Sequence, residues 1–569
     1  MDSEKETAPV PVPIPDVTPD GEPAPPKDAR FWLIFVAISC VTFLVALDTS
    51  IISTALPTIT AKLNSGELYV WIINSYLLAA TTSAPLFGQA ADIFGRRAAT
   101  VASLLLFAAG SAISGAATST GMLIAGRTIQ GFGGGGIATL SEVVVCDLVS
   151  LRERGQYAGI ISSVWAIAAV VGPIIGGAFT QNVTWRWIFY LNLPISGVTL
   201  ALVLVLLKMR NPRQGTIMER LACIDWAGYA ILTASVTAML LALTWGGTIH
   251  AWSSWRTIVP LVLGFVGLLG FFAYEAAPWV KEPVMPLRLF GNRTAAATLA
   301  ISFVHSVLLF WICYFLPVYF QAVLNATPAR SAVMLFPIAT TTAPAGIISG
   351  VMITKTGRYR RWHYIGFSLM AIGCGLFTLL DEHSSTGRWV GFQIIFGFGC
   401  GFVFTSCLPA ILASLPESEV ALATATWTFL RNLGSIWGVA IPSAIFNAHA
   451  DTIARTVSDA SLRELLLHGG AYEHATRSFV ATFKGDAALY QTILNLYVSS
   501  LKIVWQGSIG FAAFGVVLAV ALKAYKLRDE LNTEYRLENG TKEASSPEPA
   551  TENSLSELDK NSGEGEAKP

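Results

Sequence analysis

The stretch Gly88-Gln-Ala-Ala-Asp-Ile-Phe-Gly-Arg-Arg97 lies between two long apolar runs of the chain. It places two glycines, one carboxylate and two guanidinium groups close together. Glycine permits tight backbone turns, and charged side chains are costly inside a lipid bilayer. The segment therefore predicts a short, charged turn on the cytosolic side of a membrane, joining two helices that cross it.

The composition of the whole chain predicts the same class of protein. Of its 569 residues, 53% are hydrophobic and 13% are charged, whereas an average soluble chain has about 25% charged residues. A helix needs about 20 apolar residues to cross a bilayer, and only helices or closed barrels satisfy their backbone polar groups there. The apolar runs are too long for barrel strands, and they start near Phe31, Tyr69, Ala98, Met122, Tyr157, Trp187, Asp225, Arg256, Ala295, Ala332, Trp362, Arg388, Ala421 and Ile503. We expect an all-α integral membrane protein with about fourteen spans.

The distribution of charge predicts the orientation of the chain. The formal net charge is zero, which argues against a nucleic-acid partner. Basic residues concentrate in alternate short loops, including those with Arg96, Arg152 and Arg358, and this bias places both termini in the cytosol. Residues 1–30 are rich in proline and acidic groups, unlike a cleavable signal, and residues 527–569 have the composition of a disordered tail.

An internal repeat predicts two similar halves. Three landmarks of the first part of the chain have counterparts in the same order later on. Leu56-Pro57 corresponds to Leu316-Pro317, Gly88 to Arg96 corresponds to Gly350 to Arg358, and the glycine run 131–135 corresponds to 397–401. We therefore expect six-helix halves at 31–209 and 281–526, joined by a linker at 210–280 with two extra helices. Within the second half, 448–501 should form an outside loop that lies amphipathically on the outer surface.

Two charged residues lie deep within predicted spans of the first half. Asp48 occurs in the run from Leu47 to Pro57, and Arg127 precedes Gln130 by about one helical turn. A charge inside a span costs about 2.5–3.5 kcal/mol on insertion scales, so each must face a partner or a wet cavity. A carboxyl that is alternately wet and dry can load and release a proton, whereas an arginine can only bind a carboxylate, substrate or water. A purely structural role for Asp48 is the alternative.

Several motifs resemble those of one known family. The segment from Gly88 to Arg97 resembles the signature of the major facilitator superfamily, and the segment around Arg127 resembles the fourth-helix motif of its drug:proton antiporters. The stretch Gly172-Pro173-Ile-Ile-Gly176-Gly177 resembles the motif of exporters in that superfamily. The segments Trp185 to Pro194, Asp225 to Gly228 and Tyr314 to Gln321 resemble hallmarks of its fourteen-helix antiporter family, whose members include fungal multidrug and toxin efflux pumps.

The resemblance implies roles for these residues. Asp48 and Arg127 would couple transport to protons. Gly88, Asp92, Gly95 and Arg96 would form a latch between the halves that breaks and reforms. Gly172, Pro173, Gly176 and Gly177 would let a helix bend, because proline removes a backbone hydrogen bond and glycine allows helices to approach closely.

Other polar residues are candidates for a substrate cavity. They are Gln130, His305, Tyr314, Gln321 and Arg431. His305 could instead make a helix–helix hydrogen bond, and Arg431 could either bind an anionic group or hold the halves together. We interpret Glu142 and Glu275 as mainly structural. Asn182 and Asn325 lie in glycosylation sequons, and the chain suggests neither a disulfide framework nor a metal site.

Together these observations predict a proton-coupled efflux transporter for a small amphipathic organic compound, with a proton gradient and no cofactor. Gly131, Gly133 and Gly136 match a dinucleotide-loop pattern, but apolar helix surrounds them, so they do not indicate a dinucleotide site. No enzyme activity is expected. We expect a monomer in the plasma membrane, with the vacuolar membrane as the alternative. Other hypotheses are vacuolar import of basic amino acids, uptake of iron chelates, or a membrane sensor that does not transport.

Overall fold

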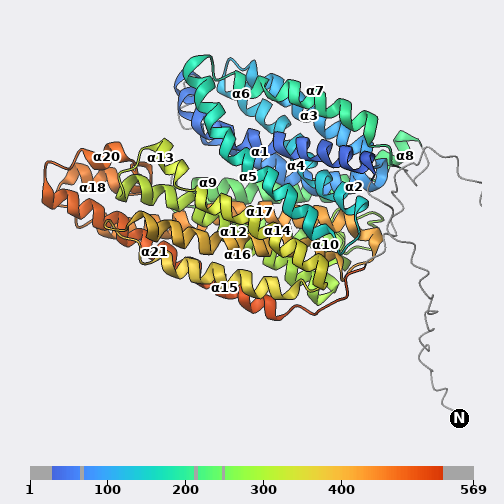
Figure 1. The fold of residues 1–569 in the computed structure, drawn as a ribbon. Helices are drawn as coiled ribbons and strands as arrows, with labels where there is room; N and C mark the ends of the chain where they lie inside the picture. Colours follow the sequence, from blue (N-terminus) through green and yellow to red (C-terminus); the bar gives the residue numbers. More distant parts are fainter. Residues whose placement is uncertain (1–27, 64–68, 210–215, 247–249, 529–569) are drawn as a thin grey trace, which may run out of the picture.

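The computed structural model describes residues 28–63, 69–209, 216–246 and 250–528. Nearly all of these residues are helical, and the helices form two bundles that lie one above the other in Figure 1. The predicted disordered tails lie almost entirely outside the described residues. The all-α membrane fold is confirmed.

The first bundle contains the helices up to residue 206. They are α1 (Ala29–Leu63), α2 (Tyr69–Phe94), α3 (Arg96–Gly115), α4 (Thr120–Leu148), α5 (Arg154–Asn182), α6 (Trp187–Tyr190) and α7 (Asn192–Leu206). Helix α4 packs against both α2 and α3, and α1 packs against α5 and α7. Glycines of α4 make this packing possible, because a Cβ on Gly133 would lie 2.4 Å from the Phe107 amide nitrogen of α3 and one on Gly135 would lie 2.2 Å from the Ala80 carbonyl oxygen of α2.

The second bundle repeats this arrangement after a helical linker. The linker comprises α8 (Ile217–Ala222), α9 (Trp226–Trp245), α10 (Trp255–Glu275) and α11 (Arg288–Gly291). The bundle comprises α12 (Arg293–Val318), the π-helix η2 (Tyr319–Val323), α13 (Pro328–Val333), α14 (Phe336–Thr356), α15 (Arg360–Phe377), α16 (Thr386–Leu412), the short helix η3 (Glu417–Glu419), α17 (Val420–Ala454) and α21 (Ala487–Val520). Helices α9 and α10 pack on each other, and α9 also touches α2 and α17, so the pair lies beside both bundles.

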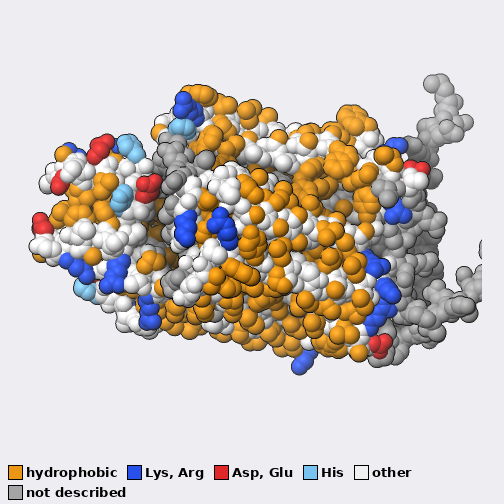
Figure 2. All heavy atoms as spheres, turned by 90° about the horizontal axis from the view of Figure 1, so that it is seen from above, with side chains coloured by type: hydrophobic (Ala, Val, Ile, Leu, Met, Phe, Trp, Pro, Cys, Tyr) orange, Lys and Arg blue, Asp and Glu red, His pale blue; other side chains and the backbone are white. Residues whose placement is uncertain are grey.

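Twelve helices of the described chain are long and apolar enough to cross a membrane. Two further helices, α2 with 26 residues and α15 with 18, are of similar length and pack within the bundles, but they are not among these twelve. The total of fourteen spans therefore stays a prediction. Apolar side chains cover the middle of the surface, while charged side chains gather mainly towards its two ends (Figure 2).

The contacts between the bundles follow the internal repeat. A Cβ on Gly88 of α2 would lie 2.3 Å from the Cβ of Ala425 on α17, and a Cβ on Gly350 of α14 would lie 2.3 Å from the carbonyl oxygen of Gly155 on α5. Gly88 and Gly350 are equivalent in the repeat, so each half presents the same glycine to its partner. Both contacts lie at the end of the molecule that carries Arg96 and Arg152, which we call the basic end.

The opposite end carries a folded cap on the second bundle. Residues of the predicted outside loop form α18 (Ala460–Leu466), α19 (Gly470–Glu473) and α20 (Arg477–Ala481), and Leu466 and Val480 are buried. Tyr497 of α21 donates a 2.9 Å hydrogen bond to the Ala471 carbonyl. The last long helix starts at Ala487 and not near Ile503; its first two residues are exposed, and its buried side chains begin at Ile493.

Candidate functional site

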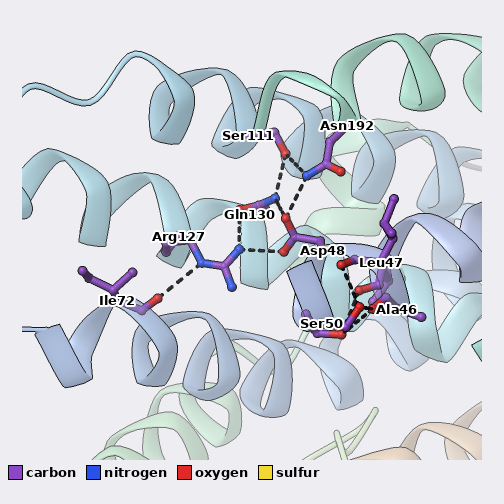
Figure 3. A network of polar contacts seen from close by, with 11 residues as sticks. Ala46, Leu47, Asp48, Ser50, Ile72, Ser111, Arg127, Gln130 and Asn192 are labelled. Atoms are coloured by element: carbon purple, nitrogen blue, oxygen red, sulfur yellow. Dashed lines mark hydrogen bonds and ion pairs between the residues drawn. The ribbon is translucent and has the colours of Figure 1, made fainter. Parts of the chain in front are cut away.

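Asp48 lies at the centre of a buried polar network in the first bundle (Figure 3). Its side chain is 1% exposed. Its Oδ2 atom accepts a 2.6 Å charge-assisted bond from Nη1 of Arg127. Its Oδ1 atom accepts from Nε2 of Gln130 at 2.7 Å and from Nδ2 of Asn192 at 2.8 Å. Both carboxylate oxygens are therefore satisfied, as a buried charge requires.

Arg127 is held as firmly as its partner. Nη1 also donates to the side-chain oxygen of Gln130 at 2.7 Å, and Nε donates to the Ile72 carbonyl at 3.3 Å. The guanidinium lies over the ring of Tyr76, 4.2 Å from its centroid, which favours the cation by a cation–π interaction. Gln130 completes the network by donating to Ser111 at 2.7 Å. The structure thus places in direct contact the two charges that the sequence assigned together to proton coupling.

The network joins five helices, α1, α2, α3, α4 and α7, and the sequence predicted only part of it. Asn192 and Ser111 were not proposed as site residues. Asn192 does lie within the Trp185–Pro194 segment, so that motif was a usable signal for it. Gln130 was proposed for a substrate cavity, but it is fully buried and hydrogen-bonded to Asp48. In this conformation it belongs to the ion-pair network.

The second bundle has no equivalent of this ion pair at the matching positions. Leu308 and Gln393 correspond to Asp48 and Arg127 in the repeat, and Gln393 donates to the Met334 carbonyl at 3.0 Å. His305 is buried, and its Nε2 donates to the Cys400 carbonyl at 3.1 Å, which favours the helix–helix role over a cavity role. Chemistry that needs a buried carboxylate–guanidinium pair is therefore available in the first bundle.

The segment from Gly88 to Arg97 forms a charged cluster at the basic end. Arg96 is 3% exposed, and it donates to Asp92 at 2.6 Å and to Asp147 of α4 at 2.7 Å. Gly95 has φ 87° and ψ 155°, a backbone conformation that is essentially limited to glycine. The prediction of a tight turn is confirmed at Gly95 but is wrong at Gly88, which lies inside α2. Gly88 is instead needed for the close approach of α17.

Polar contacts cross between the halves at the same end. Nε of Arg152 donates to the Thr354 carbonyl at 2.5 Å, and the Thr354 hydroxyl donates to the Arg152 carbonyl at 3.1 Å. Arg154 lies 3.5 Å from a carboxylate oxygen of Glu417. Thr354 occupies the place of Asp92 in the repeat. The first half uses this position for an ion pair with its own arginine, and the second half uses it to bind the opposite half.

One glycine of the proposed export motif, Gly172, packs α5 against α1. A Cβ on Gly172 would lie 2.0 Å from the Ser50 hydroxyl oxygen, and that hydroxyl donates to the Ala168 carbonyl at 3.0 Å. Gly177 has open space around it, and the Gly176 carbonyl accepts a hydrogen bond from Thr180. Helix α5 continues from Arg154 to Asn182 through this motif, which includes Pro173. Bending at the motif stays a prediction.

The remaining candidates occupy varied surroundings. Tyr314 is 43% exposed and stacks on Phe310 with 6.1 Å between ring centroids. Gln321 donates to Ser331 at 3.1 Å, and Arg431 is partly exposed beside Phe404. A cavity role for these three residues stays a prediction.

The two glycosylation candidates and the two structural glutamates also differ. Asn182 is exposed, whereas Asn325 is partly buried and donates to Tyr490 at 3.5 Å. Glu275 accepts hydrogen bonds from the amide groups of Val284 and Met285, each at 3.2 Å, so it ties α10 to the entry of the second half. Glu142 accepts no hydrogen bond from a described residue. All seven cysteines are free thiols.

The chain is similar to several named fungal proteins. An MFS-type efflux pump of Fusarium, LUC4, is 63% identical over 94% of this chain and 95% of its own length. The acurin A biosynthesis cluster MFS-type transporter of Aspergillus aculeatus is 64% identical over 91% of this chain and 94% of its own length. The efflux pump FUS6 of Gibberella fujikuroi is 60% identical over 93% of this chain and 95% of its own length.

Solved structures share the fold at low sequence identity. The human organic anion transporter MFSD10 (TETRAN) has a TM-score of 0.58 and 14% identity, covering 86% of this chain and 100% of its own. The proton:xylose symporter XylE has a TM-score of 0.54 and 13% identity, covering 87% of this chain and 98% of its own. Residues 38–439 match the Major Facilitator Superfamily. With the paired six-helix bundles and the relatives above, this match establishes that the chain belongs to the major facilitator superfamily.

Proposed function

We propose that this protein is a proton-coupled efflux transporter that exports a small amphipathic organic compound, such as a toxin or secondary metabolite. Two of the relatives are named efflux pumps, and a third is named for a biosynthesis cluster. The protein would act as a monomer in the plasma membrane, with the basic end and both termini in the cytosol. The proton gradient would supply the energy, and no cofactor is needed.

The observation that carries this proposal is the buried pair of Asp48 and Arg127. Protonation of Asp48 removes the charge that holds the guanidinium, and Arg127 can then rest on Gln130, the Ile72 carbonyl and the Tyr76 ring. Asp48 thus has one cationic partner, Arg127, and two neutral ones, Gln130 and Asn192. When Asp48 gains a proton, the Arg127 cation keeps three neutral groups around it, which lowers the cost of its charge in the bilayer.

A packed route leads from this pair to the contact between the halves. Ser50, two residues after Asp48, binds the Ala168 carbonyl of α5. The basic end of α5 touches α14 at Gly155 and Gly350. A rearrangement of α1 on protonation would therefore act on the helix that contacts the opposite half. This is the physical basis we propose for coupling proton binding to alternating access.

The conformation fits one step of such a cycle. The halves touch at the basic end through Gly88 and Ala425, and the two bundles diverge towards the end that carries α13 and α20 (Figure 1). With the basic end in the cytosol, this state faces outward. We propose that it is the deprotonated state, because the Asp48–Arg127 pair is intact.

Transport into vesicles tests the proposal directly. Purified protein is reconstituted, a panel of amphipathic fungal metabolites is screened for uphill transport driven by a pH gradient, and the first transported compound becomes the probe. Asp48→Asn should abolish gradient-driven accumulation. Asp459→Asn is the matched control, because Asp459 lies in the exposed cap and its carboxylate only caps α18. Unchanged gradient-driven transport by the Asp48→Asn protein would refute the coupling role.

Localisation and transport together separate the proposal from its rivals. A fluorescent tag should mark the plasma membrane of the cell. A signal at the vacuolar membrane, together with uptake of basic amino acids into vacuoles, would contradict export across the plasma membrane. Reconstituted protein that transports no compound of the panel would instead favour a sensor.

A further inference from the structure

Arg431 is a charged residue inside α17 that has no hydrogen bond or ion pair with the described residues. Its guanidinium lies 4.6 Å from the ring centroid of Trp427 and 5.2 Å from that of Phe404. Trp427 is buried, whereas Phe404 and Arg431 are partly exposed. Five N–H donors on a permanent cation are thus presented in a span, where an unpaired charge is costly.

The opposite half contributes one carboxylate to the region around Arg431. Glu142 of α4 interacts electrostatically with Arg431, and α4 packs against α17. The Glu142 side chain is 6% exposed, and within the described chain it has no ion pair within 4.0 Å. The other titratable groups near Arg431 are His305 and Cys407. His305 already donates to Cys400, so neither it nor the thiol supplies the missing anion.

The structure argues against Arg431 as a fixed clamp between the halves. The halves are in contact on this same helix, where Gly88 meets Ala425. A clamp should be closed in such a state, yet Glu142 and Arg431 do not form an ion pair. A cation that stays open beside an apolar ring is better suited to a ligand.

We propose that Arg431 binds an acidic oxygen group of the transported compound, a carboxylate or an enolate, and that Glu142 competes for the same guanidinium. The planar fork of arginine pairs with a carboxylate through two hydrogen bonds. Phe404 offers an apolar face to the unsaturated part of the compound next to the acid. Glu142 repels a bound anion and can replace it on Arg431 when α4 and α17 move. This rests on the proposed export function and adds a substrate class to it.

A pair of probes that differ only in charge tests this subsite. The full-length protein in lipid nanodiscs is titrated with pyrenebutyric acid and with its uncharged methyl ester, with binding read from pyrene fluorescence. Wild-type protein should prefer the acid. Arg431→Gln should weaken acid binding about 10- to 100-fold, because it removes hydrogen bonds to a charged group, and the loss of one such bond weakens binding by about this factor. Glu142→Gln should strengthen acid binding several-fold, and neither change should alter binding of the ester.

The ester also reports whether each variant is folded. Arg431→Lys, which keeps the charge but not the fork, should retain part of the acid preference. Wild-type protein that binds both probes equally would overturn the proposal, and so would equal weakening of acid and ester by Arg431→Gln or weaker acid binding to Glu142→Gln. Failure of proton coupling is a separate result, because it is read from gradient-driven transport by Asp48→Asn and not from probe binding.

Discussion

Replacing Gly88 by alanine should open the contact between α2 and α17. The new Cβ would lie 2.3 Å from the Cβ of Ala425. Non-bonded carbons prefer about 3.5–4.0 Å, so the helices must separate by roughly 1.2 Å or more. Overpacking of this kind costs about 1–3 kcal/mol. Since the cost falls only on the state in which the halves touch, the population of that state should fall about 5- to 150-fold relative to the separated state.

The structure also predicts a rescue. When Ala425 is changed to glycine, the atoms that remain near the new methyl group are the Ala421 carbonyl oxygen at 3.4 Å and the Ala425 Cα at 3.8 Å. Both are ordinary van der Waals distances. Gly88→Ala combined with Ala425→Gly should therefore recover the contact, apart from the cost of about 1 kcal/mol for glycine inside a helix.

Distances between spin labels measure the effect. Labels at Arg97→Cys and Arg361→Cys report the separation of the halves at the basic end, because both positions are exposed and belong to opposite bundles. Cys223, the exposed native thiol, is replaced by serine. Gly375→Ala is the matched control, because no atom lies within 4 Å of its added Cβ. An unchanged distance distribution for Gly88→Ala, or no recovery on adding Ala425→Gly, would refute the reasoning.

Further predictions concern stability at the basic end and in the buried network. Arg96→Met should lower the free energy of unfolding by about 3–5 kcal/mol, because it removes the guanidinium that pairs with both Asp92 and Asp147, and adding Asp147→Asn should recover part of the loss. Equal thermal midpoints for wild type and Arg96→Met would contradict this. Gly95→Ala should cost about 1–3 kcal/mol because of its backbone conformation, and Gly291→Ala, with open space around it, should cost far less. Asn192→Ala should destabilise the protein by about 1.5–3 kcal/mol by removing a donor to a charged group, and intact thermal stability would show that the Asn192 bond to Asp48 contributes nothing.

Much of the architecture could be predicted from order along the chain. Three features can be seen along the chain: the apolar runs, the repeat of Gly88 in Gly350, and the charge of loops such as the one with Arg152. Because a bilayer requires spanning segments to satisfy their backbone polar groups, the apolar runs must form helices. The start of the last long helix could not be predicted in the same way. Polar residues inside the helix, such as Gln491 and Asn495, interrupt the apolar run before Ile503, so the run alone does not show that α21 begins at Ala487.

The candidate site, too, could be predicted only in part from the sequence. A carboxylate and a guanidinium inside apolar runs are visible in sequence, so Asp48 and Arg127 could be proposed together for proton coupling. That they are partners of each other, and that Asn192 completes the shell, depends on how α1, α4 and α7 dock.

Gly88 and Glu142 show why the contacts between the two halves could not be predicted from the sequence. The sequence predicted a turn for Gly88, because glycine permits tight turns, and a structural role for Glu142, because it lies towards the cytosolic end of its helix. Gly88 lies against Ala425, and Glu142 interacts electrostatically with Arg431. Each of these partners is in the other half of the molecule, nearly 300 or more residues further along the chain. Hydrophobicity acts on each segment by its composition and so can be read from sequence. Contacts and charge pairs act over a few ångströms, so only the folded arrangement of the two halves reveals them.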